Sequence, residues 1–309
     1  MFQSFEKYNL SHHALFKYKE IIIFCIISSV SSILMAEAVK TVNPVTSTFI
    51  TFSLTALIFI LLNINSFRQI IMASFQQRLT LLQINLTTLA NTLLAFVGMT
   101  YVSPLVYGII FFGCLPFFNN ALQWRLFANN KSSYTFNLVS CLSAIFIAGY
   151  ISDQTMIANT QGISYALISC FSAALYMLRS EYFHRKTGLT PSQILSVRFY
   201  LVILICGGYA LLQPNTLILN SNEWLMLSGA AITGSVIPLF LMQVAIKKLG
   251  AAVTAQFMPS IPVLCMTFLT ALGIAQFSGL EILAIVSFSM LLIAQIRYKV
   301  HKRHVAANA

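Results

Sequence analysis

The sequence predicts an all-α membrane protein with ten transmembrane helices arranged as two inverted five-helix repeats. Three observations predict this fold: the composition, ten long apolar segments, and a weak internal repeat. Hydrophobic residues make up 58% of the 309 residues and charged residues only 8%, whereas a soluble domain carries about 25% charged residues. This composition excludes a soluble enzyme, a nucleic-acid-binding protein and a disordered chain.

The ten segments follow from length and apolarity, since a helix needs about 20 mostly apolar residues to cross the hydrocarbon core. Charged or turn-forming clusters divide the chain into segments 20–40, 44–63, 79–101, 103–123, 135–151, 160–179, 190–212, 222–246, 250–272 and 278–296. Tight hairpins are expected where segments meet at Val102-Ser103-Pro104 and at Leu249-Gly250. Residues 1–19 are expected to lie along the interface or to form a disordered tail, and residues 297–309 form a basic tail.

The positive charges predict the orientation of these spans. If the N-terminus is cytoplasmic, all of the 18 Lys and Arg residues except Lys40 and Arg198 fall on cytoplasmic segments. A Lys and Arg bias in short loops sets membrane topology. We therefore expect an inner-membrane protein with both termini in the cytoplasm. The net charge of +11 then faces the anionic inner leaflet and does not indicate nucleic acid as a partner.

The internal repeat appears when the sequence is shifted by about 147 residues (190 − 43). Asn43-Pro44 then falls on Thr190-Pro191, Phe52 falls on Phe199, and Pro116 falls on Pro262 with one residue of slippage. The two halves, 20–151 and 160–296, each contain five predicted spans. An odd number of spans inserts the second half upside down, and such inverted repeats place a binding site near the bilayer midplane between them.

Several motifs resemble the EamA-type members of the drug/metabolite transporter superfamily. Residues Pro191, Arg198 and Phe199 are similar to the family pattern in span seven, and the small-residue hairpin from Gly250 leads to Pro262 in span nine. The resemblance covers residues 20–296. Two departures are that Thr51 stands where the second half has Arg198, and that spans four and nine lack the Leu-Gly-Glu ending common in the family.

The resemblance implies a secondary transporter rather than an enzyme. Its substrate is expected to be a small metabolite, amino-acid-like or drug-like, that crosses the inner membrane by alternating access. Export is favoured, and metabolite uptake or exchange by the same fold is the alternative. The residues themselves leave the substrate, the direction, the coupling ion and the oligomeric state open.

Two ionisable residues fall within predicted spans, where charge is costly and is a functional candidate by default. Arg198 is a candidate for binding an anionic group of the substrate. We favour a structural role, in which it braces helix-end carbonyls or extends to the cytoplasmic surface, since members of the similar family often have Arg there whatever they carry. Glu37 is a candidate for proton coupling. Its alternative, which we favour, is a pair with Lys40 one turn along the helix.

Neutral polar and aromatic residues add further candidates. Asn85, Thr88 and Asn91 are spaced to share one helix face, where they line a water-filled path or make interhelical hydrogen bonds. Further polar candidates are Gln243 and Gln256. Candidates for the wall of an apolar pocket are Tyr101, Tyr107, Phe111, Phe112 and Phe240, with Tyr107 also assigned to substrate binding. Proline removes a backbone hydrogen bond and kinks a helix. We therefore expect hinges or helix breaks at Pro116, Pro238, Pro259 and Pro262.

The sequence indicates no catalytic, metal or cofactor site. All six cysteines lie in apolar segments without C-x-x-C spacing, which indicates packing roles, and the five histidines lie in charged connections, where we expect them to be solvated. A Walker motif for ATP is absent. Because no paired acid and base lie within the spans, a membrane-embedded enzyme is disfavoured. A scaffold or small channel fits the composition but does not account for the repeat.

Overall fold

The computed structural model describes residues 18–123, 131–152, 156–274, 276–279, 281–282 and 285–286, and within these ranges the side chains of 33–40, 131–134 and 156–158 are not described. The regular elements of this part are all helical. They are α2 (Lys19–Thr41), α3 (Pro44–Leu62), η1 (Ile64–Ser66), α4 (Phe67–Gln76), α5 (Arg78–Gly98), α6 (Pro104–Gln123), α7 (Lys131–Ile151), α8 (Met156–Thr187), α9 (Pro191–Leu195), α10 (Tyr200–Leu212), η3 (Pro214–Leu217), α11 (Ser221–Ala230), the π-helix η4 (Ala231–Val236), α12 (Ile237–Leu249), α13 (Ala251–Phe257) and α14 (Ser260–Ala271).

Seven helical stretches are long and apolar enough to cross a membrane within the described part of the chain. They are Pro44–Leu62, Arg78–Gly98, Pro104–Gln123, Asn159–Thr187, Pro191–Leu212, Ser221–Leu249 and Ala251–Ala271, and Thr135–Ile151 is a shorter apolar helix. Helix α2 occupies the first predicted segment. The tenth predicted segment, 278–296, and both predicted tails lie largely outside the described residues. The described part of the chain is therefore all-helical, and the protein is a multi-pass membrane protein.

The two X-Pro motifs begin helices as the sequence predicts. Proline fits the first turn of a helix, where its missing N–H has no partner in any case. The Oδ1 atom of Asn43 accepts the N–H of Val45 at 2.9 Å before α3. Thr190 and Gln193 form a reciprocal capping box before α9, in which the Thr190 N–H donates to Gln193 Oε1 at 2.8 Å.

Three of the expected spans, seven, eight and nine, are interrupted. The sequence predicts the interruptions in spans eight and nine but not the one in span seven. Span seven was expected as one helix, but it divides between α9 and α10 at residues 196–199, beside Arg198. Span eight contains η4 directly before Pro238. Proline provides no N–H for the preceding turn, and a π-helical turn accommodates such a gap. Span nine divides at Met258–Pro259 between α13 and α14.

Other prolines leave their helices intact. Helix α6 is continuous through Pro116, and Pro262 lies in the first turn of α14. The chain between spans two and three also forms α4, which the sequence did not predict. Its Ile70 and Ser74 are buried while Phe75 is exposed.

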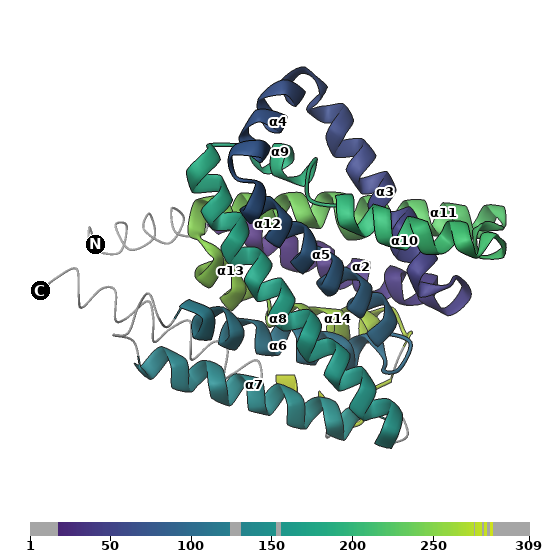
Figure 1. The fold of residues 1–309 in the computed structure, drawn as a ribbon. Coiled ribbons are helices and arrows are strands. Elements are labelled where there is room, and N and C mark those ends of the chain that lie inside the picture. Colours follow the sequence, from purple (N-terminus) through teal and green to yellow (C-terminus); the bar gives the residue numbers. More distant parts are fainter. Residues whose placement is uncertain are drawn as a thin grey trace, which may run out of the picture.

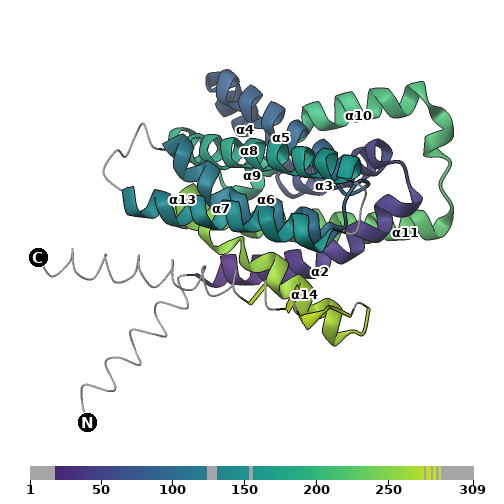
Figure 2. The ribbon, with the colours of Figure 1, turned by 90° about the horizontal axis from the view of Figure 1, so that it is seen from below.

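The helices pack into one bundle in which α4 and α7 lie at opposite edges (Figure 1). Helix α8 packs against α5 and α6, while α2 packs against α11, α12 and α14. Figure 2 shows α2 and α14 side by side at another edge. Helices α3 and α10 approach closely because Gly207 has no side chain: a Cβ atom there would lie 2.7 Å from Phe49 Cε2.

Candidate functional site

A cavity of about 190 Å³ lies inside the bundle and is lined by residues from both halves of the chain. Residues on α2, α3, α5 and α6 line it from the first half, and residues on α8, η4 and α12, together with Arg198 and Met258, line it from the second. The cavity therefore adjoins the interruption in span seven, the π-helical turn in span eight and the interruption in span nine. At these places backbone hydrogen bonding departs from the regular helix.

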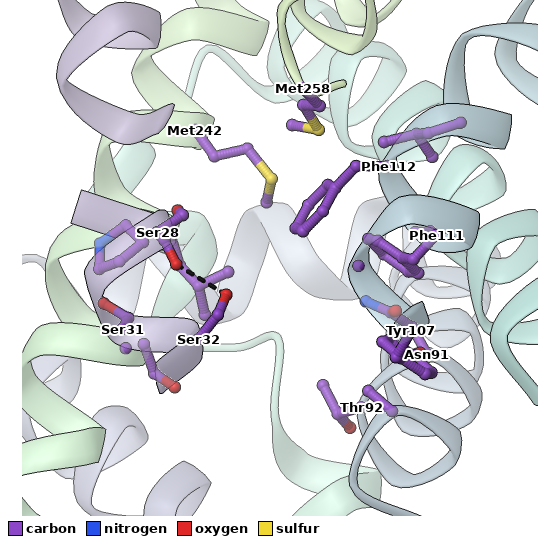
Figure 3. Close-up of a pocket in the computed structure, with 18 of the residues that line it drawn as sticks. Ser28, Ser31, Ser32, Asn91, Thr92, Tyr107, Phe111, Phe112, Met242 and Met258 are labelled. Carbon is purple, nitrogen blue, oxygen red and sulfur yellow. Dashed lines mark hydrogen bonds between the residues drawn. The ribbon is translucent and has the colours of Figure 1, made fainter. Parts of the chain in front are cut away.

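The cavity has a polar side, an aromatic side and a methionine-rich end. Figure 3 shows the serines of α2 facing Tyr107, Asn91 and Thr92 across the space, with Met242 and Met258 nearby. The remaining apolar lining includes Phe24, Phe52, Phe96, Phe111, Phe112, Met99, Met177 and Leu239. Such a predominantly apolar pocket with a few placed polar groups is typical of small-molecule sites.

Arg198 is the charged side chain among the described residues that line this cavity. It is 1% exposed and lies in the interruption between α9 and α10. Its Nε–H donates to Thr88 Oγ1 at 3.0 Å. Its Cζ atom lies 3.6 Å from the ring centroid of Tyr176, a stacked arrangement that holds the guanidinium plane. Its Nη1 atom is buried and has no hydrogen-bond partner among the described residues.

The tyrosine under this guanidinium belongs to a buried polar network. The Tyr176 hydroxyl accepts a hydrogen bond from Gln243 Nε2, and Gln243 Oε1 accepts one from Ser180 Oγ at 2.9 Å. Gln243 Oε1 also lies 3.0 Å from His184 Nε2, and His184 Nδ1 lies 3.1 Å from the Leu189 carbonyl oxygen. The network joins α8, the chain before α9, and α12.

His184 corrects the expectation that the histidines are solvated. It is 5% exposed, although Arg185 and Lys186 follow it directly. The charged residues beside it are typical of a solvated loop, which is why the sequence predicts an exposed histidine. In the structure α8 continues through this stretch to Thr187, and one face of its last turns packs inward.

The predicted polar face of span three packs against other helices. Asn85 Nδ2 donates to the Val197 carbonyl at 3.0 Å, and Asn85 Oδ1 accepts the N–H of Leu201 at 3.4 Å, so this side chain bridges the interruption in span seven. Asn91 Oδ1 accepts from Ser169 Oγ at 3.0 Å. Thr88 accepts from Arg198. All three side chains make interhelical hydrogen bonds, and Asn91 also lines the cavity.

The other candidates are divided between the cavity and its surroundings. Tyr107 lines the cavity and its hydroxyl donates to Ser169 Oγ at 2.7 Å. Phe111, Phe112 and Pro238 also line it, while Gln243, Gln256, Tyr101 and Phe240 do not. Glu37 and Lys40 belong to α2, but the structure does not describe their side chains.

The serine face of α2 was missed by the sequence reading. Ser28, Ser31 and Ser32 line the cavity, and their i, i+3, i+4 spacing places them on one helix face. Ser31 Oγ approaches the Thr233 carbonyl oxygen in η4 at 2.6 Å. The signal was the small polar spacing inside an otherwise apolar segment, which is also common at helix interfaces.

In the described part of the chain, no three His, Cys, Asp or Glu side chains lie close enough together to bind a metal ion. All six cysteines are buried and free, which agrees with the packing role predicted for them.

The fold and the cavity together describe a multi-pass membrane protein with a mostly apolar cavity between its helices. The sequence model of the EamA-like transporter family matches residues 160–294, so this part of the chain belongs to that family, within the drug/metabolite transporter superfamily. The match agrees with the resemblance, and it relates residues 160–294 to a family of membrane transporters of small molecules.

One solved structure, a crystal structure of a protein with 14% sequence identity, has the same fold. The TM-score is 0.66, and the likeness covers 89% of this chain and 93% of the other. No curated protein matches the sequence.

Proposed function

We propose that this protein is a secondary transporter that moves a small metabolite across the inner membrane by alternating access, with export as the favoured direction. The observation that carries the proposal is the cavity between the two halves, which adjoins three interrupted spans. In secondary transporters, discontinuous helices near the midplane form the substrate site, and rocking of the repeats exposes it to each side in turn. The basic bias of the predicted cytoplasmic segments supports cytoplasmic termini.

Contacts between repeat-equivalent residues support the proposal of two inverted five-helix halves, 20–151 and 160–296, within ten spans. Residues related by a two-fold axis touch each other only where they lie close to that axis. Phe52 and Phe199, which the repeat aligns, are stacked with ring centroids 5.2 Å apart. The helices that carry them, α3 and α10, also pack against each other.

A second pair of contacts follows the same relationship. Cys25 Sγ on α2 donates to the Phe257 carbonyl on α13 at 3.5 Å. Cys170 Sγ on α8 donates to the Phe111 carbonyl on α6 at 3.0 Å. The two bonds are repeat-equivalent. Cys25 and Cys170 are 145 residues apart (170 − 25), and Phe111 and Phe257 are 146 residues apart (257 − 111). Both separations are close to the repeat shift of about 147 residues. Span one thus contacts span nine as span six contacts span four.

The hinges of this mechanism are proposed at Pro238 and Pro259, where η4 and the gap between α13 and α14 adjoin the cavity. Pro116 and Pro262 lie in continuous helix and are proposed as lesser bends. Glu37 remains a candidate for proton coupling. The alternative transport mode is uptake or exchange through the same cavity. A membrane-embedded enzyme is disfavoured because the described cavity lining brings together no acid and base pair.

Flux from proteoliposomes tests the proposal. The vesicles are loaded with labelled amino acids and small aromatic metabolites, and efflux is followed with and without an imposed pH gradient. We expect efflux above that of protein-free liposomes. A pH-gradient response would direct attention to Glu37. Absence of flux for every solute from folded protein contradicts the transporter assignment.

A pair of variants on α2 ties the flux to the cavity. Ser28→Phe places a large side chain in the cavity and should abolish most of the flux. Val30→Phe adds a similar bulk at a side chain that is 43% exposed on the same helix, and should retain it. Equal flux through both variants contradicts a path through this cavity.

A further inference from the structure

The strongest unexplained feature of the described part of the chain is a buried positive charge that has no balancing anion among the described side chains. Arg198 is 1% exposed, and the ion pairs among the described side chains, Arg185–Glu181 and Lys248–Glu20, do not include it. The hydrogen-bond acceptor that it does have, Thr88 Oγ1, is neutral. Because buried charges are costly unless they are paired, this site is complementary to an anion.

The guanidinium is held at its Nε–H and on one face, and its Nη1 is buried without a hydrogen-bond partner among the described residues. Its Nε–H is engaged by Thr88, and its plane rests on Tyr176 with Cζ 3.6 Å from the ring centroid. The Tyr176 hydroxyl is itself fixed by Gln243. Nη1 is without a partner among the described residues. An arginine binds a carboxylate through two parallel hydrogen bonds, and the unpartnered Nη1 is a donor that one oxygen of such a carboxylate would satisfy.

The charges that line the cavity favour a ligand with a single negative charge. Arg198 provides one positive charge, and the described lining provides no carboxylate to balance an ammonium group of the ligand. The repeat-equivalent position in the first half is the neutral Thr51. An organic cation would face Arg198 directly, and a zwitterionic amino acid would bring an unbalanced ammonium into an apolar site.

The walls and the volume define the rest of the ligand. Phenylalanine and methionine side chains make up most of the lining, and such surfaces bind apolar or aromatic groups. The cavity of about 190 Å³ is somewhat larger than an apolar cavity of about 150 Å³ that binds benzene. It is smaller than the roughly 300–1,000 Å³ of drug-sized sites. One ring, or a branched chain of similar size, with a carboxylate fills it.

We propose that the central cavity binds small organic monocarboxylates with an aromatic or branched apolar body, whose carboxylate is bound by Arg198. The proposal rests on the transporter function above and narrows its substrate class. It separates three solute types that the fold alone does not distinguish: apolar acids, amino acids and organic cations.

Two sets of probes test the proposal on the unaltered full-length protein in detergent. The first set is benzoate, benzamide and benzylammonium, and the second is phenylpropionate and phenylalanine. Thermal unfolding and equilibrium binding are measured for each. Benzoate should bind about 10- to 100-fold more tightly than benzamide, the range expected when a charge-assisted hydrogen bond is lost, and should raise the unfolding temperature. Equal binding of benzamide, or tighter binding of benzylammonium, overturns the proposal. Tighter binding of phenylalanine than of phenylpropionate also overturns it.

Variants then assign the contact to the guanidinium. Arg198→Gln and Arg198→Lys should each weaken benzoate binding about 10- to 100-fold, since the ammonium of lysine cannot reproduce the two parallel bonds. Arg179→Gln, at an exposed arginine on α8, should bind benzoate as the original protein does. Benzoate affinity unchanged in folded Arg198→Gln overturns the proposal. If the Arg198 variants do not fold, the probe series above decides it.

Flux separates this proposal from the transporter function. Benzoate binding without benzoate flux from proteoliposomes supports the anion site and contradicts transport of this class. Flux of amino acids or cations without benzoate binding supports a transporter and overturns the anion site.

Discussion

Phe52 and Phe199 stack with their ring centroids 5.2 Å apart and their planes inclined by 28°. They are 4% and 1% exposed, and Arg198 adjoins the pair, with its Cζ atom 5.3 Å from the Phe199 ring centroid. The contact therefore joins α3 to the start of α10 directly beside the Arg198 guanidinium. It also joins the two positions that the shifted sequence aligns.

This stack should be measurable as a coupling between the two rings. Replacing either residue by Leu removes it, and a double-mutant cycle should give a coupling free energy of about 0.5–1.5 kcal/mol, the range for aromatic pairs. Unfolding in detergent by a chaotrope provides the free energies. Phe52 and the 40% exposed Phe171 form the control pair. A coupling of zero between Phe52 and Phe199 argues against a stabilising stack.

Asn85 should be essential for the interruption in span seven. Asn85→Leu keeps most of the volume but leaves the Val197 carbonyl and the Leu201 N–H without their side-chain partner. We expect a loss of about 1–3 kcal/mol in the free energy of unfolding for each buried group left unpaired. Gln83→Leu changes an exposed residue of the same helix and is the control. A similar stability of both variants contradicts this role.

Adjacent glycines on α10 give a matched test of helix packing. A Cβ atom at Gly207 lies 2.7 Å from Phe49 Cε2, whereas a Cβ atom at Gly208 meets nothing within 4 Å. Both Ala variants gain about 1 kcal/mol in helix propensity, so their difference isolates the clash. Gly207→Ala should be less stable than Gly208→Ala by about 1–3 kcal/mol in thermal or chaotrope unfolding. Equal stabilities would contradict a tight contact between Gly207 and Phe49.

The two glutamine candidates should differ in their effects. Gln243 is 0% exposed and hydrogen-bonds with Tyr176, Ser180 and His184, so Gln243→Leu leaves several buried polar groups unpaired. We expect a loss of about 1–3 kcal/mol or more in the free energy of unfolding. Gln256→Leu, at a half-buried residue of α13, should change it little. If Gln256→Leu is destabilised and Gln243→Leu is not, the stabilising role belongs to Gln256 and the prediction is wrong.

Much of the fold was predictable because membrane insertion depends on properties that are local in sequence. Apolar length places a span, so helices occupy the first nine predicted segments. Proline after a capping residue begins a helix, as at Pro44 and Pro191. The match to the EamA-like family also confirmed what the motifs around Arg198 and Gly250 had indicated.

The site was less predictable because a span that is apolar on every side does not indicate which face packs inward. The sequence by itself placed Arg198 within the membrane and Asn85, Thr88 and Asn91 on one helix face. Only the tertiary structure decided that Asn85 bridges the interruption in span seven and that His184 is buried. It also decided that the guanidinium rests on Tyr176 without an anion among the described residues. These features depend on contacts between residues about 20 to more than 100 positions apart, where packing rather than local sequence determines the environment of each side chain.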